Sequence, residues 1–266
     1  MFQILHSVLL ILLLVFTRTP FVFAADHSAW TNLLKQHVES GSVNYAAFQN
    51  ESKHLQDYLN SLARLSKDQF SEETREEKLA TWINLYNASV IAKILDFYPV
   101  DSIQQIPNFW DDPFVYLAGA RYSLREIRDQ IVRREFRDER AALALVSGTK
   151  SSTPLRSEAY EGNGLIEQLK DQMKLFLADE RYNQIKAGQK KIKLAAVFKE
   201  LANDFVLGYG SHEEGGFSPQ EFAILSFIRV HVDDVKLREW IDARKYKIRY
   251  EAPDFSLNQS PEKKLK

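Results

Sequence analysis

The sequence of 266 residues contains no cysteine. Disulfide bonds, thiolate ligands for zinc and cysteine nucleophiles are therefore excluded, and the fold must rely on packing. An excess of charge of one sign is also lacking, because 35 Lys and Arg residues stand against 36 Asp and Glu residues. This balance gives no indication of a nucleic-acid partner. The histidines show no metal-ligand spacing to one another, so we expect no metal site and no cofactor.

Long hydrophobic runs are scarce, and the clearest one lies near the start of the chain. It covers Val8–Phe16 and is too short to span a bilayer comfortably. Val22-Phe23-Ala24 follows it, with small or branched residues at the two positions that a signal peptidase reads. We therefore predict a signal peptide over residues 1–24 and a periplasmic or secreted mature chain that begins at Ala25 and has no stable membrane span. The first residues include no Lys or Arg, which leaves an uncleaved N-terminal anchor as the alternative.

The remaining sequence, residues 25–259, is long enough for one good core or two small ones and shows no internal repeat. We predict an α+β fold, a helix-rich single domain around a small mixed or antiparallel sheet. Amphipathic periodicity predicts helices over 28–40, 51–65, 124–136, 164–179 and 219–230. Strands are predicted for a hairpin over 114–122, for 191–194, for 246–250, and for the continuous apolar run 141–146 as a buried central strand. The charged residues 260–266 are predicted to be a disordered tail.

One further predicted helix carries two amides inside an otherwise apolar segment, Thr81–Ile91. The residues before it, Ser71–Thr74, resemble an N-terminal cap. Asn84 and Asn87 are three residues apart, so on a helix they share a face. Burying an amide without partners is costly, so other parts of the fold must form hydrogen bonds with both. The two amides either form a structural network that holds loops together or line a polar site.

A series of short motifs occurs in a fixed order along most of the mature chain. The motifs are Gly41-Ser42-Val43-Asn44-Tyr45, Trp82-Ile83-Asn84-Leu85-Tyr86-Asn87-Ala88, Tyr98-Pro99-Val100-Asp101-Ser102-Ile103, Ser123-Leu124-Arg125-Glu126-Ile127, Thr153-Pro154-Leu155-Arg156-Ser157-Glu158-Ala159-Tyr160 and Phe255-Ser256-Leu257-Asn258. In this order they resemble the domain-of-unknown-function 547 family, and the helix with the two amides is the most specific match. The name of that family leaves its activity open.

The resemblance also implies that this chain is a divergent member, because it departs from the family pattern at five reactive positions. Arg128 and Asp129 stand where the pattern has Glu and His, Ala142 stands where it has His, and Ser147 and Ser152 stand where it has Cys. Glu, His and Cys could support acid–base, thiolate or metal chemistry. Their joint replacement predicts that the five positions lie in one region of space. It also predicts that any chemistry of the family's site is not performed in that way here.

The polar residues that remain are the candidates for binding: Asn84, Asn87, Ser147, Ser152, Arg156 and Tyr160. The guanidinium of Arg156 suits a carboxylate or phosphate, although it could instead pair with Glu158. We assign no catalytic residue, since a serine without a nearby base is a weak nucleophile.

Two functions therefore stay open, and whether the chain is an enzyme is undecided. The first is an exported binding or scaffold protein without catalysis, whose partner the sequence does not name. The second is a hydrolase or transferase with a rearranged polar site. A pocket that places Ser147 within hydrogen-bond reach of a His, Asp or Glu would favour the enzyme.

Overall fold

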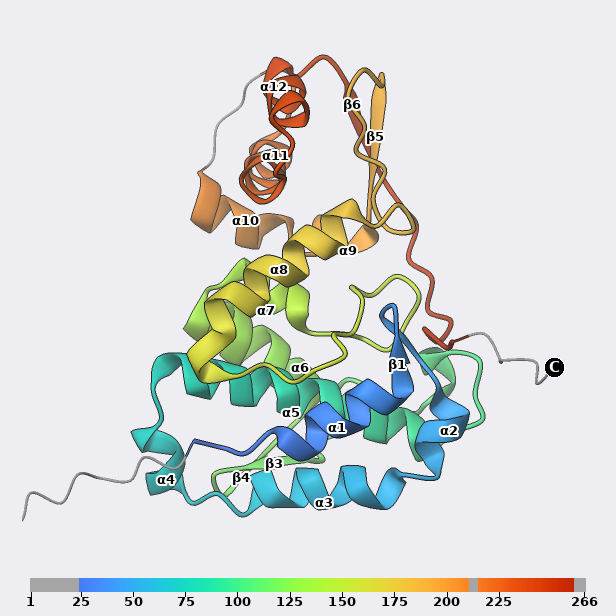
Figure 1. The fold of residues 1–266 in the computed structure, drawn as a ribbon, viewed down its shortest axis with the longest axis vertical. Helices are drawn as coiled ribbons and strands as arrows, with labels where there is room; N and C mark the ends of the chain where they lie inside the picture. The colour runs from blue at the N-terminus through green and yellow to red at the C-terminus, as the bar shows by residue number, and fades with distance from the viewer. Residues whose placement is uncertain (1–23, 211–214, 261–266) are drawn as a thin grey trace, which may run out of the picture.

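The computed structural model describes residues 24–210 and 215–260. The predicted signal peptide apart from Ala24, and the predicted tail apart from Ser260, lie outside these residues. The described residues form twelve α-helices and three sheets of two strands each, which confirms the predicted helix-rich α+β class. Figure 1 shows two tiers, the lower built from residues 24–178 and the upper from residues 191–210 and 215–250. Within the described ranges, no helix is both long enough and apolar enough to cross a membrane.

The lower tier packs around α5 (Arg75–Leu95), which is buried on nearly all sides from Leu79 onward. An apolar surface all round is typical of a helix in a protein interior. Thr74 begins the helix through a capping box with Glu77, within the cap predicted from the sequence. The other helical segments of this tier include α1 (Ser28–His37), α2 (Tyr45–Gln49), α3 (Ser52–Ala63), α4 (Lys67–Glu72), η1 (Ile103–Gln105), α6 (Leu124–Glu126), the π-helical η2 (Ile127–Phe136) and η3 (Gly162–Gly164).

The upper tier has a hydrophobic core of its own. Its elements are α9 (Ala196–Glu200), α10 (Ala202–Tyr209), α11 (Pro219–His231), α12 (Val235–Ala243) and the parallel strands β5 (Lys191–Leu194) and β6 (Lys247–Tyr250). The rings of Phe198, Phe205 and Phe227 pack at its centre, with centroids 4.9 to 6.2 Å apart. Aromatic pairs at this spacing stabilise a core beyond the area that they bury.

Two helices, α7 (Glu139–Ala144) and α8 (Leu165–Ala178), belong to both cores. In α7, Ala141 and Ala144 face the first core while Ala142 and Leu143 face the second. The N-terminal part of α8 likewise packs in the first core, and Met173, Phe176 and Leu177 pack in the second. The two cores are therefore joined by shared helices as well as by contact.

The apolar run 141–146 is the one predicted strand that the structure contradicts, because most of it lies in α7. Asp138 caps this helix by accepting hydrogen bonds from the backbone amides of Arg140 and Ala141. A helix between two cores is apolar on every side, so its sequence has the same appearance as that of a buried strand. The strands also form separate pairs in place of one sheet: β1 (Val38–Glu39) with β2 (Ser42–Val43), β3 (Val115–Leu117) with β4 (Ala120–Tyr122), and β5 with β6. The other predicted helices and strands are confirmed within a few residues at their ends.

After β6 the chain returns to the lower tier, where residues 254–260 cross its surface. The hydroxyl of Tyr45 donates to Asn258 Oδ1 over 2.7 Å, and the amide of Ser260 donates to the carbonyl of Val43 over 2.8 Å. The amides of Lys150 and Asn258 bond with the carbonyls of Ser256 and Gly148. This returning segment fixes the loop of residues 147–153, which begins just after α7.

Candidate functional site

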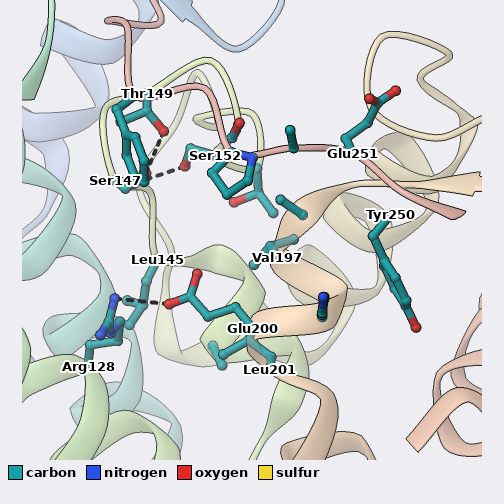
Figure 2. Close-up of a pocket in the computed structure, with 18 of the residues that line it drawn as sticks. Arg128, Leu145, Ser147, Thr149, Ser152, Val197, Glu200, Leu201, Tyr250 and Glu251 are labelled. Carbon is teal, nitrogen blue, oxygen red and sulfur yellow. Dashed lines mark hydrogen bonds and ion pairs between the residues drawn. The ribbon is translucent and has the colours of Figure 1, made fainter. Parts of the chain in front are cut away.

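A cleft of about 770 Å³ lies where the two tiers meet. One wall is the loop of residues 147–153 and the other is α9 with residues 249–255. Figure 2 shows the hydroxyl groups of the loop on one side and Glu200 with Arg128 below them. Clefts between packed units that combine apolar walls with a few polar groups are common binding sites.

The loop with the hydroxyl groups is held by its own polar residues and by α5. The Ser147 hydroxyl pairs with the Thr149 hydroxyl over 2.9 Å, and Ser152 Oγ accepts the Ser147 amide over 2.9 Å (Figure 2). Gly148 has a φ of +73°, and a Cβ there would lie 2.4 Å from Ile94 Cδ1. Glycine adopts this left-handed conformation without strain, which explains why the loop turns at this residue.

A chain of charges forms the lower edge of the cleft. Arg128 donates to Asp129 over 2.9 Å and to Glu200 over 3.2 Å, and its guanidinium lies 5.4 Å from the Trp110 ring centroid. Although burial raises the pKa of the Asp129 carboxyl, hydrogen bonds and charge from Arg128 and Arg133 hold it below its usual value. The charge of Arg128 is thus balanced by two carboxylates, and the ion pair with Glu200 connects the two tiers.

The five positions that the resemblance marks as departures from the family pattern come together, as predicted. Arg128, Ala142, Ser147 and Ser152 all line the cleft, and Asp129 pairs with Arg128 beside it. Among the described residues, no histidine lines the cleft and the Ser147 hydroxyl has no His, Asp or Glu partner. The carboxylates that line the cleft, Glu200 and Glu251, pair with Arg128 and Lys193.

The two side-chain amides of α5, Asn84 and Asn87, form hydrogen bonds with the backbone of neighbouring segments. Asn84 donates to the Tyr160 carbonyl over 2.7 Å and accepts the Tyr160 amide over 2.9 Å. Asn87 donates to the Ala144 carbonyl over 3.0 Å and accepts the Val146 amide over 2.9 Å. Both side chains are buried. Of the two alternatives, their contacts therefore match a structural hydrogen-bond network that holds loops together. Val146 directly precedes Ser147, and Asn87 thereby positions one wall of the cleft.

The six binding candidates do not gather in one place. Ser147 and Ser152 line the cleft, whereas Arg156 lines a smaller pocket of about 430 Å³. Arg156 pairs there with Glu158 over 2.6 Å, which is the partner that the sequence offered as an alternative to a ligand. It also pairs with Asp171 over 2.8 Å. Tyr160 is buried, which raises the pKa of its hydroxyl. A binding role for these residues stays a prediction.

Several polar residues of the cleft were not identified from the sequence. Lys199 and Arg249 are exposed on its wall and make no ion pair with another described residue, whereas Glu251 pairs with Lys193.

Thr153 is 2% exposed, and its buried hydroxyl has no hydrogen-bond partner in the described part of the chain. Burial raises the pKa of Tyr250 to about 12, so its hydroxyl keeps its proton. A single sequence does not distinguish a cation in a cleft from any other exposed cation. Thr153, by contrast, lies within one of the motifs and could have been named as a candidate for binding.

Within the described ranges, no group of three or more His, Cys, Asp or Glu residues could hold a metal ion.

The fold and the cleft together define a helix-rich α+β protein with a polar site between two cores. Residues 70–177 match the family model described as "Protein of unknown function, DUF547", and over this segment the resemblance to that family is confirmed. The matched segment contains Arg128, Ala142, Ser147 and Ser152, whereas Lys199 and Arg249 lie beyond it. No curated protein and no solved structure matches the chain.

Proposed function

We propose that this chain is an exported binding protein without catalytic activity, and that the cleft between its two cores holds a small anionic ligand. The observation that carries the proposal is a pair of cations, Lys199 and Arg249, that make no ion pair with another described residue and lie on the wall that faces the hydroxyl groups of the loop. The charges of Arg128 and Glu251 are balanced by their own partners. The remaining field of the cleft is positive and favours an anion.

The hydroxyl groups supply the polar contacts that would orient such a ligand. Thr153 has an unpartnered hydroxyl, and Ser152 uses its oxygen as an acceptor, which leaves its proton available to donate. Carboxylates and phosphate monoesters match these donors and cations best, because each offers several acceptor oxygens with negative charge.

Catalysis by Ser147 is the alternative, and the geometry gives it little support. The hydroxyl of Ser147 pairs with that of Thr149, which is not a base. A serine-reactive fluorophosphonate probe distinguishes the two functions. We expect no labelling of the purified protein, and stoichiometric labelling at Ser147 or Ser152 would overturn the non-catalytic proposal in favour of a hydrolase.

Binding is tested by calorimetric titration with a panel of small carboxylates and phosphate monoesters. The variants are Arg249→Gln and Lys199→Gln, and Lys247→Gln on the same strand as Arg249 is the control, since Lys247 is exposed outside the cleft. A charge-assisted hydrogen bond contributes about 1.5–3 kcal/mol, so each cleft variant should weaken binding by about tenfold or more. The proposal fails if no anion binds, or if the control weakens binding as much as the cleft variants do.

A further inference from the structure

Glu73 is a buried carboxylate with few partners. It is 3% exposed and lies between α4 and the capping residue of α5. Among the described residues it accepts two hydrogen bonds, from the backbone nitrogen of Ala25 over 3.1 Å and from the Thr81 hydroxyl over 3.5 Å. A carboxylate can accept about four hydrogen bonds, and burying its charge without a cation is costly. Burial accordingly raises the pKa of Glu73.

The groups around Glu73 do not supply the missing cation. His27 bonds with the Tyr58 hydroxyl, and burial lowers the pKa of His27 to about 4, so that it is neutral at pH 7. Lys78 donates to the Ser71 carbonyl and makes no ion pair with Glu73, although its charge acts to lower the pKa of that carboxyl. Glu77, which is used in the capping box, adds a second negative charge nearby.

The remaining group at this carboxylate is the nitrogen of Ala25. Ala24 is exposed, whereas Ala25 is partly buried and packs against the first core. The peptide bond between them is the bond that the sequence Val22-Phe23-Ala24 marks for a signal peptidase. Two independent observations, a cleavage motif and an under-partnered buried carboxylate, therefore meet at the same nitrogen atom.

We propose that hydrolysis of the Ala24–Ala25 bond creates the cation that Glu73 lacks, so that Glu73 is the binding site for the new N-terminus of the mature chain. One water is consumed. Its oxygen becomes part of the Ala24 carboxylate, and the Ala25 nitrogen leaves as an amine that is protonated to an ammonium. The ammonium takes the place of the amide donor and pairs with the Glu73 carboxylate. The Asp26 carboxylate accepts the Ser28 amide at the start of α1, whereas the Ala25 nitrogen donates to Glu73.

The position of the cut matters, because consecutive Cα atoms are about 3.8 Å apart. Cleavage one residue earlier would place the ammonium on exposed Ala24, and cleavage one residue later would remove the donor to Glu73. Processing at this bond would thus stabilise the fold, and the inference rests on the export part of the proposed function and not on the cleft.

The test uses the full chain, produced in cells that export it and purified in its processed form. Intact mass gives the first residue, which we expect to be Ala25. The rate of acylation of the α-amino group with acetic anhydride is then measured against pH. An ordinary α-amino group has a pKa of about 7.7–8.0, and a close opposite charge shifts a pKa by about one to three units. We expect an upward shift, with acylation at pH 7 slowed by about tenfold or more.

Two variants complete the experiment. Glu73→Gln should return the pKa of the α-amino group to its ordinary value, whereas Glu72→Gln, an exposed neighbour with no ion pair to a described residue, should leave the upward shift intact. The measurement on the unmodified protein is decisive even if Glu73→Gln does not fold. An ordinary pKa at Ala25 would overturn this inference alone, and an intact N-terminus at Met1 would overturn the export proposal with it.

Discussion

Replacing Asn87 by leucine tests whether the amides of α5 hold the loop beside the cleft. Leucine has the same number and branching of side-chain heavy atoms as asparagine but removes both hydrogen bonds, the one to the Ala144 carbonyl over 3.0 Å and the one from the Val146 amide over 2.9 Å. Each backbone group is left buried without its partner, at a cost of about 1–3 kcal/mol. The added apolar burial of leucine offsets part of this loss.

The expected destabilisation by Asn87→Leu is therefore about 3 kcal/mol. For a chain of this size the melting temperature should fall by about 6–12 °C. Urea denaturation followed by circular dichroism measures the free energy of unfolding. Asn32→Leu is the control, because Asn32 is exposed on α1 and makes no hydrogen bond to a described residue; it should change stability by less than about 0.5 kcal/mol.

Hydrogen exchange gives a second readout of the same substitution. The Val146 amide should exchange faster in Asn87→Leu, because its acceptor is gone. A loss of stability below about 0.5 kcal/mol, with the Val146 amide still protected, would refute the reasoning.

Two further predictions concern acid and the loop of the cleft. The pKa of His27 is about 4 in the fold against 6.5 ordinarily, so the unfolded chain binds its proton first and stability falls as the pH drops from 6.5 to 4, by up to about 3 kcal/mol. His27→Gln should flatten this part of the pH profile of unfolding, and an unchanged profile would contradict the burial argument. Gly148→Ala should destabilise by about 1–3 kcal/mol in thermal denaturation, because strain at a φ of +73° adds to a 2.4 Å contact with Ile94. Gly188→Ala, with a φ of +82° and no atom within 4 Å, should lose only the backbone part, and equal losses would show that the contact at Gly148 has no effect.

Local sequence signals predicted the elements well where a helix or strand has one buried face. Their failure at residues 141–146 has a physical cause, since α7 is enclosed by two cores and shows no periodicity. The arrangement of the strands as separate pairs depends on packing between segments that are far apart in the sequence. Local sequence patterns therefore do not predict it.

The cleft was predicted in part. The resemblance to the family predicted that Arg128, Ala142, Ser147 and Ser152 lie together, and all four line the cleft. This prediction was possible because residues that form one site share a region of space even when they are far apart in the sequence. Lys199 and Arg249 could not be found in this way, since an exposed cation looks the same on any surface of the fold. Arg156 pairs with the nearby carboxylates Glu158 and Asp171, and a binding role for it stays a prediction.

The segment that returns to the lower tier has a consequence for the timing of folding. The bond from Tyr45 to Asn258 joins residues 213 positions apart, and it helps to close the first core. During synthesis this contact cannot form until residue 258 has emerged from the ribosome. Closure of long loops also slows folding. The first core is therefore completed only near the end of synthesis, after most of the chain has been made.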